Sequence, residues 1–194
     1  MKVAVVKYNA GNIQSVSYAL ERMNIAFEVT AEPEKINGAD KVIFPGVGEA
    51  STTMDFLRSS KLDKVIVNLK QPVLGICLGM QLLCRHSDEN DTDCLGVFDE
   101  TVKKFEPTPR LKVPHMGWNS LLQTKDWIGK DLNEKYVYFV HSYYVPVNAY
   151  TVGETDYIVP FSAAMRKNNF HAVQFHPEKS AEAGEKILKN FMDL

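Results

Sequence analysis

The sequence contains few cysteines, and their spacing argues against two cysteine-rich classes of protein. Only three occur in 194 residues, Cys77, Cys84 and Cys94. The number is odd and no two of them are separated by two residues, which disfavours both a disulfide framework and a zinc site. A cysteine with a function in this chain is therefore expected to act through its own chemistry.

Long apolar runs and an excess of positive charge are also missing. No apolar stretch approaches the ~20 residues that a membrane span needs, and residues 1–7 are too short and too interrupted for a signal peptide. The 22 Lys and Arg residues against 24 Asp and Glu residues give a net charge of −2. Nucleic acid and anionic membranes both require a basic surface. We therefore expect a cytoplasmic protein that binds neither.

The overall composition is that of an ordinary globular protein. Hydrophobic residues make up 45% and charged residues 24%, which is close to the average for soluble domains. The sequence shows no repeats, low-complexity tracts or linker, and a chain of this length can bury roughly 70% of its unfolded surface. Residues 1–194 are therefore predicted to form a single domain.

The first half of the chain alternates short apolar runs with amphipathic segments. Buried strands are predicted at 3–6, 26–29, 41–44 and 72–76, and helices at 13–23, 53–57, 62–69 and 80–83. This alternation predicts an α/β fold with an open, mostly parallel sheet covered by helices on both faces, as in flavodoxin-like proteins. Cys84 continues the last of these helical patterns and is expected to be a packed core residue.

The second half has a different pattern. Strand-like segments occur at 97–105, 136–140, 143–147, 163–166 and 170–174, and an amphipathic helix is predicted at 181–194. We expect this β-rich half to add an insertion and an antiparallel edge to the sheet, which mixed sheets tolerate. The polar, acidic segment 88–93 is expected to be a solvated loop.

Cys77 lies in a sequence that is typical of a nucleophile elbow. The segment G-I-C-L-G follows a predicted strand and precedes a predicted helix, and its flanking glycines permit a tight turn with close packing. Such a turn exposes the thiol above the sheet edge, where the helix N-terminus favours the thiolate. The backbone amide of Leu78 then faces any oxyanion formed on an attacked carbonyl.

A base and a group that orients it are available near the end of the chain. In His176-Pro177-Glu178, the proline stiffens a turn that follows the predicted strand 170–174. The carboxylate can hold the imidazole in one tautomer and stabilise it when it is protonated. A cysteine elbow and this turn in one α/β chain predict nucleophilic catalysis.

A glycine-rich segment ends another predicted strand. Gly46 and Gly48 enclose Val47 in P-G-V-G, at the carboxyl end of the strand 41–44. Ligands bind at this edge of open parallel sheets. Because the glycines let a peptide group turn or approach a substrate, an amide of this segment could be a second oxyanion donor.

Taken together and in this order, these motifs resemble the class I (triad-type) glutamine amidotransferases. The resemblance extends over nearly the whole chain and rests on the segments 8–13, 45–48, 75–81, 114–119, 139–143 and 176–180. H-M-G-W-N and H-P-E-K-S are similar to one branch of the family, the subunits that work beside a cyclase in histidine biosynthesis. They differ from the corresponding segments of the anthranilate and GMP synthetase amidotransferases.

The resemblance implies a role for each residue of a triad. Cys77 would attack the carboxamide carbon of glutamine, release ammonia and form a glutamyl thioester that water hydrolyses. His176 would transfer the proton, and Glu178 would orient His176. The family works without a metal or an organic cofactor.

The resemblance also implies the oxyanion, substrate and partner contacts. The amide of Leu78, joined by that of Val47 or Gly48, would form the oxyanion hole. The amino acid part of glutamine would be held by Gly46, Gln81, Ser142 and Tyr143. Ammonia would pass to a (β/α)8-barrel cyclase in a heterodimer, with Lys179, Tyr136 and Tyr138 at the interface.

Other functions remain open at this point. The chain could be the glutaminase subunit of another synthase, or a stand-alone cysteine hydrolase of γ-glutamyl substrates. It could also be a binding module that has kept the fold and lost the chemistry, although the intact Cys77, His176 and Glu178 argue against this. Ammonia release from glutamine, with and without a cyclase, would separate these alternatives.

Overall fold

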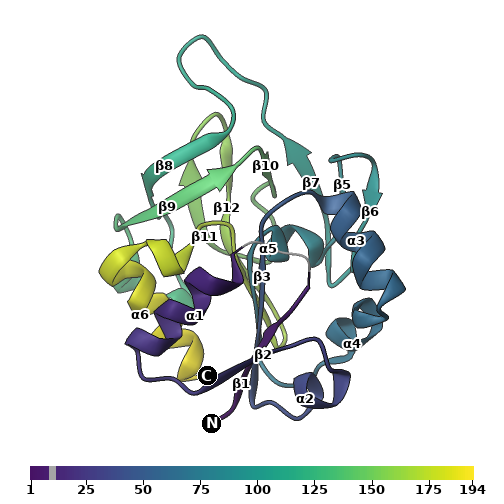
Figure 1. The fold of residues 1–194 in the computed structure, drawn as a ribbon. Helices are drawn as coiled ribbons and strands as arrows, with labels where there is room; N and C mark the ends of the chain where they lie inside the picture. Colours follow the sequence, from purple (N-terminus) through teal and green to yellow (C-terminus); the bar gives the residue numbers. More distant parts are fainter. Residues whose placement is uncertain (9–11) are drawn as a thin grey trace.

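The computed structural model describes residues 1–8 and 12–194. Residues 9–11, which belong to the 8–13 motif, lie outside the described part. In the described chain, the central sheet has seven strands: β1 (Val3–Val6), β2 (Phe27–Thr30), β3 (Lys41–Gly46), β4 (Val73–Cys77), β11 (Thr151–Asp156), β12 (Pro160–Lys167) and β13 (Phe170–Val173). Their order is β11-β12-β13-β4-β3-β1-β2 (Figure 1).

The strand directions agree with the sequence prediction. Strands β1, β2, β3, β4 and β13 are parallel to one another, whereas β12 and β11 add an antiparallel edge. Along β1, Val3 and Val5 pack into one core and Ala4 and Val6 into the other. Burial on both faces explains why this strand is an uninterrupted apolar run. The predicted mostly parallel α/β sheet is confirmed.

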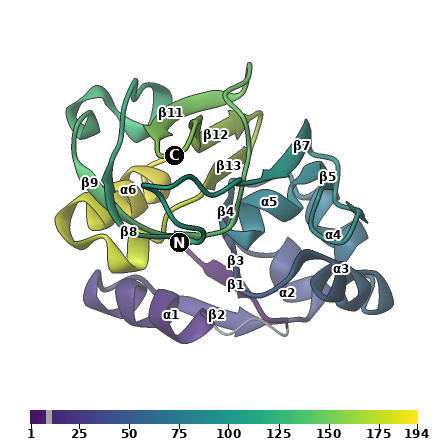
Figure 2. The same ribbon diagram turned by 90° about the horizontal axis from the view of Figure 1, so that it is seen from above.

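Helices cover both faces of the sheet (Figures 1 and 2). The α-helices are α1 (Ile13–Arg22), α2 (Pro33–Asn37), α3 (Ala50–Ser59), α4 (Leu62–Asn68), α5 (Leu78–Leu82) and α6 (Ala181–Met192), and short 3-10 turns are η1 (Asp126–Ile128), η2 (Lys130–Leu132) and η3 (Pro177–Lys179). Helices α1 and α6 bury their apolar stripes in one core. Helices α2, α3 and α4 bury theirs in the other. No helix in residues 1–8 and 12–194 is long and apolar enough to cross a membrane.

Two smaller sheets give the second half its β-rich character. One contains β5 (Cys84–Ser87), β6 (Thr92–Asp93), β7 (Phe98–Lys104) and β10 (Tyr143–Tyr144), in the order β10-β7-β5-β6. The other is an antiparallel pair of β8 (His115–Ser120) and β9 (Tyr136–His141). We call this pair the β8–β9 ribbon. The ribbon lies near α6, above the edge where the parallel strands end (Figure 1).

Three local predictions are wrong. Cys84 is buried, as expected, but it lies in β5, which pairs with β7, and not in a helix. The segment 88–93 is not wholly a solvated loop, because Thr92 is buried in β6. The predicted strand 143–147 is a strand only over β10, followed by an isolated bridge from Pro146 to Phe161. Cys84 pairs with Phe98, Thr92 with Ser87, and Pro146 with Phe161. Such cross-strand pairings are not encoded by local apolar periodicity.

Candidate active site

Cys77 occupies a strained turn at the end of β4. Its φ and ψ angles are 53° and −108°, a conformation that a residue with a side chain rarely adopts and that is found preferentially at functional sites. The next turn of chain begins α5 and packs directly on β3. A Cβ atom at Gly79 would overlap the carbonyl oxygen of Phe44. This geometry is that of the predicted nucleophile elbow.

His176 and Glu178 lie together beyond the end of β13, the strand next to β4. The Nδ1 atom of His176 is 2.8 Å from Oε1 of Glu178, and both side chains are buried. Burial disfavours a charged imidazole, but hydrogen bonding to Cys77 and to Glu178 outweighs it and raises the pKa of His176 to about 10. An imidazole with this pKa readily takes up the proton of a neighbouring thiol.

The turn that carries His176 is held on both sides. The backbone amide of His176 donates to the carbonyl of Tyr138 in β9, and the amide of Tyr138 donates to Oγ of Ser180. On the other side, α6 approaches so closely that a Cβ atom at Gly184 would overlap the carbonyl oxygen of Pro177. The position of the imidazole is therefore fixed by both the β8–β9 ribbon and α6.

A cavity of 380 Å³ opens beside the Cys77 thiol. It is lined by Val47, Gly48, Cys77, Leu78, Gln81, Glu89, Pro114, Val140, His141, Ser142, Tyr143, His176 and Lys179. The predicted nucleophile, base, oxyanion residues and three of the four predicted substrate residues thus share one cavity. Their roles remain predictions, but their placement is the one that the chemistry requires.

The predicted oxyanion residues come from two separate segments that both line the cavity. Leu78 begins α5, and Gly48 follows β3 with a φ of +118°, which strains any residue other than glycine. Gly46 differs from the expectation because it does not line the cavity. It is buried behind it at the end of β3, where a Cβ atom would meet the Tyr8 hydroxyl and Leu78.

Three of the predicted substrate residues, Gln81, Ser142 and Tyr143, form part of the cavity wall. The amide of Gln81 donates to the carbonyl of Tyr143 and to Oε1 of Gln174, both at 3.0 Å. The side chain of Gln81 is therefore fixed before any ligand arrives. Ser142 and the half-buried Tyr143 stay accessible from the cavity.

Sequence reasoning missed the second layer of this site. Gln174 donates to the Cys77 sulfur at 3.7 Å, and that sulfur donates to the carbonyl of Val140 at the same distance. Asn12 donates to Oε1 of Glu178. Both residues could have been found from their position in the sequence. Asn12 follows β1 and Gln174 follows β13, at the carboxyl edge of the sheet where ligands bind.

The predicted interface residues lie on or beside the β8–β9 ribbon. Tyr136 is exposed at the start of β9, Tyr138 contacts Trp118 edge to face with centroids 5.9 Å apart, and Lys179 lines the cavity. Met116 and Trp118 of β8 are 63% and 53% exposed. An apolar face of this kind beside a reactive cavity is typical of a protein interface.

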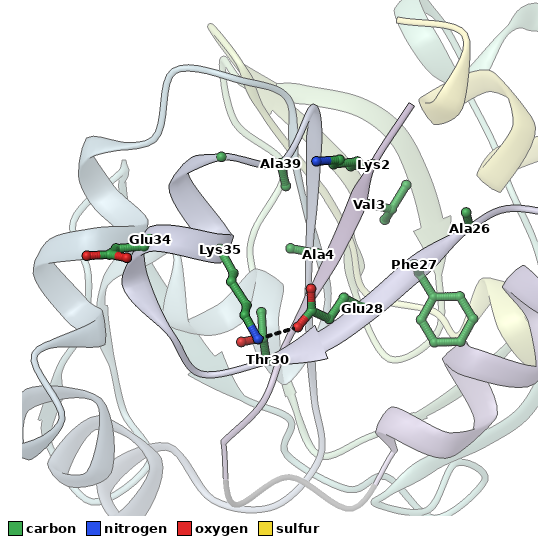
Figure 3. Close-up of a pocket in the computed structure, with 11 residues that line it drawn as sticks. Lys2, Val3, Ala4, Ala26, Phe27, Glu28, Thr30, Glu34, Lys35 and Ala39 are labelled. Atoms are coloured by element: carbon green, nitrogen blue, oxygen red, sulfur yellow. Dashed lines mark ion pairs between the residues drawn. The ribbon is translucent and has the colours of Figure 1, made fainter.

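A second hollow, of 450 Å³, lies at the β2 edge of the sheet (Figure 3). It runs between β2 and α2 and is crossed by an ion pair of 2.7 Å between Lys35 and Glu28. It contains no cysteine or histidine, so it lacks the groups for acyl transfer. Within residues 1–8 and 12–194, no group of three or more His, Cys, Asp or Glu side chains could hold a metal ion.

Comparisons with known proteins agree with this geometry. The family described as "Glutamine amidotransferase class-I" matches residues 4–194. The chain is 60% identical to "Imidazole glycerol phosphate synthase subunit HisH" of Bacteroides thetaiotaomicron and 44% identical to the protein of the same name from Escherichia coli K12, in both cases over 100% of each chain.

Solved structures share the fold at much lower identity. A structure titled "Crystal structure of glutamine amidotransferase" has a TM-score of 0.75 at 17% identity, covering 98% of this chain and 97% of the other. PurLQS of Thermotoga maritima has a TM-score of 0.69 at 13% identity, covering 99% of this chain and 97% of that one. The family resemblance drawn from the sequence is confirmed: the chain belongs to the class I glutamine amidotransferases.

Proposed function

We propose that this chain, as one domain over residues 1–194, hydrolyses glutamine as the ammonia-producing subunit of an imidazole glycerol phosphate synthase. The observation that carries the proposal is the strained Cys77 elbow next to the buried His176–Glu178 pair, with Cys77 and His176 lining the same cavity. The choice of synthase rests on the names of the relatives that are 60% and 44% identical over their full length.

The first step is attack of the Cys77 sulfur on the carboxamide carbon of glutamine. His176 accepts the thiol proton and returns it to the departing nitrogen, so that ammonia leaves and a glutamyl thioester remains. Glu178 holds Nδ1 of His176 at 2.8 Å and stabilises the imidazolium. The raised pKa of His176 supports its role as the proton acceptor.

The second step returns the enzyme to its initial state. Water, deprotonated by His176, attacks the thioester carbon, and glutamate leaves as the proton returns to the Cys77 sulfur. Negative charge develops on the carbonyl oxygen in both steps, and the amide of Leu78 is placed to stabilise it. The amide of Val47 or Gly48 supplies the second donor once the 45–48 loop is oriented toward the cavity.

The ammonia is consumed by a partner subunit. We propose a (β/α)8-barrel cyclase, bound as a heterodimer on the β8–β9 ribbon, that combines ammonia with a phosphoribulosyl formimino intermediate. The products are imidazole glycerol phosphate and an aminoimidazole carboxamide ribotide. The exposed Met116, Trp118 and Tyr136, and Lys179 at the cavity mouth, support docking at this face.

A coupled assay tests this function. Glutamate release is measured for the chain alone, with a barrel cyclase, and with the cyclase and its nucleotide ligand, while cyclase product is followed with glutamine or with an ammonium salt. We expect glutamine to support product formation only when both subunits are present. A hydrolase that ignores the cyclase would instead be a stand-alone enzyme, and silence in all three mixtures would refute glutaminase activity.

A further inference from the structure

Two buried histidines face each other across the β8–β9 ribbon. His115 of β8 pairs in register with His141 of β9, and its Nδ1 atom is 2.9 Å from Nε2 of His141. The His115 ring is stacked between Phe139 and Tyr157, with centroid distances of 4.8 and 4.0 Å. His141 also lines the cavity beside Cys77. The pair therefore links the exposed ribbon to the candidate active site.

The partners of these rings determine where each proton is. Nδ1 of His141 is 2.7 Å from the carbonyl oxygen of Tyr143. A carbonyl only accepts, so Nδ1 of His141 carries a hydrogen. If that ring is neutral, its Nε2 atom is an acceptor and Nδ1 of His115 must be the donor. The remaining Nε2 atom of His115 then accepts from the amide of Asn119 at 3.4 Å.

Both rings are neutral in the folded protein. Burial lowers the pKa of His115 to about 4 and that of His141 to about 3. Among the described residues, no carboxylate lies within ion-pair distance of either ring, and the titratable neighbours are His176, the other ring of the pair and Tyr157, whose ring is stacked on His115. With these lowered pKa values, both rings are much weaker proton acceptors than His176.

The same carbonyl that receives the His141 hydrogen also anchors the substrate wall. The amide of Gln81 donates to the Tyr143 oxygen at 3.0 Å, and its second hydrogen goes to Gln174, which faces the Cys77 sulfur. Without His141, this partly buried carbonyl would lose one of two side-chain donors. Gln81 would then lose the fixed acceptor that orients it.

We propose that His115 and His141 are positioning residues, a neutral pair with both protons on Nδ1 that holds the Tyr143 carbonyl and Gln81 in the geometry that binds glutamine. The proposal rests on the proposed function, because it assumes that the cavity receives glutamine. The pair acts through Tyr143 and transfers no proton. His115 keeps the His141 ring in place by donating a hydrogen bond from its Nδ1 atom to Nε2 of His141.

The first test is spectroscopic and needs no activity. Ring nitrogen-15 shifts are recorded on the full chain between pH 6 and 8 and assigned by their loss in His115→Phe and His141→Phe. We expect each ring to show one protonated and one unprotonated nitrogen, with the proton on Nδ1 throughout. A charged ring, or a proton on Nε2 of either ring, would overturn the proposal whatever the enzyme does.

The second test measures the pocket. Inactivation of Cys77 by the glutamine analogue 6-diazo-5-oxo-L-norleucine gives a saturation constant for the analogue. Phenylalanine is chosen for His141 because an aromatic ring fits beside Phe105 and Phe161. We expect His141→Phe to raise the saturation constant about tenfold, the effect of one lost hydrogen bond. His141→Asn keeps a donor near the Nδ1 position and is expected to recover most of the loss.

His171→Phe is the matched control, because His171 is also buried and neutral but lies outside the cavity. It is expected to bind the analogue as the wild type does. Equal constants for His141→Phe and wild type, or no recovery in His141→Asn, would overturn the positioning role. A wild-type chain that the analogue does not label at all would refute the proposed function, while the nitrogen-15 spectra would still decide the state of the pair.

Discussion

The side-chain amide of Asn12 donates a hydrogen bond to the same carboxylate oxygen of Glu178 that faces His176. Asn12 follows β1 and Glu178 follows β13, so this contact joins two strand ends across the sheet. The orientation of the base therefore depends on a contact between two residues that are 166 positions apart in sequence.

Asn12→Ala is expected to lower kcat for glutamine about 10- to 100-fold, because a hydrogen bond to a charged group is worth about 1.5–3 kcal/mol.

Glu178→Gln should lower kcat in the same way as Asn12→Ala. His176→Ala should lower kcat by about 10²- to 10⁴-fold or more, since it removes proton transfer itself. Steady-state glutamate release in the presence of the partner measures all three. Near-normal turnover in His176→Ala would show that another base operates.

Cys77→Ala is expected to abolish glutamine-dependent synthesis by the complex and to leave ammonium-dependent synthesis intact, because only the ammonia source is removed. Cys84→Ser is the matched control at the other buried cysteine. Burial raises the pKa of the Cys84 thiol well above its usual value, so it should not react with a glutamine-like electrophile. Peptide mapping that found the label on Cys84 would contradict the elbow assignment.

Gly48→Ala is expected to reduce the partner-stimulated glutaminase rate while leaving partner affinity nearly unchanged. The added Cβ atom meets nothing within 4 Å, so the effect comes from the φ of +118° and not from a clash. Loss of one oxyanion donor costs about 10²- to 10³-fold in rate. The stimulated rate is measured as glutamate production with and without the cyclase and its ligand. An unchanged rate in Gly48→Ala would show that the 45–48 loop does not supply an oxyanion donor.

Trp118→Ala is expected to weaken cyclase binding by about 30-fold, because a buried interface tryptophan commonly contributes about 2 kcal/mol or more. Phe56→Ala provides a control at an exposed aromatic residue of α3, outside the β8–β9 ribbon. Titration calorimetry of the two variants against the cyclase compares them directly. Equal affinities would place the interface on another face.

Stability is expected to fall as the pH drops from about 6.5 to about 4, partly because of His171. Burial lowers the pKa of His171 to about 4 in the folded chain, so below pH 6.5 the unfolded state binds a proton that the folded state does not. This costs about 1.4 kcal/mol per pH unit in that window. His171→Phe should remove one proton from the pH slope of the unfolding free energy measured in urea; an unchanged slope would contradict it.

Local sequence patterns were sufficient for the parts of the fold that are built locally. The valine-rich run at 3–6 and the glycine-flanked Cys77 each carry their structure in a few adjacent residues, and both were predicted correctly. The burial of Cys84 was predicted correctly but its place in a helix was not, because the apolar spacing of residues 80–84 fits a helix. Its pairing opposite Phe98 in β7 makes it a strand.

The same distinction applies to the site. His176 and Glu178 are two residues apart, so their contact could be expected from the sequence. Gln174 donates to the Cys77 sulfur only because β13 lies beside β4. Asn12 reaches Glu178 only because α1 packs against η3, the turn that contains Glu178. Such contacts depend on strand order, which the residues themselves do not state.

The pairing of β13 with β4 also has a kinetic consequence. The two strands bring together residues 97 positions apart, such as Gln174 and Cys77, and closing so long a loop is a slow part of folding. A chain that has formed only β1 to β4 would carry its nucleophile without its base. Recovery of thiol reactivity during refolding should therefore lag behind recovery of helix content, and it reports when the sheet has closed.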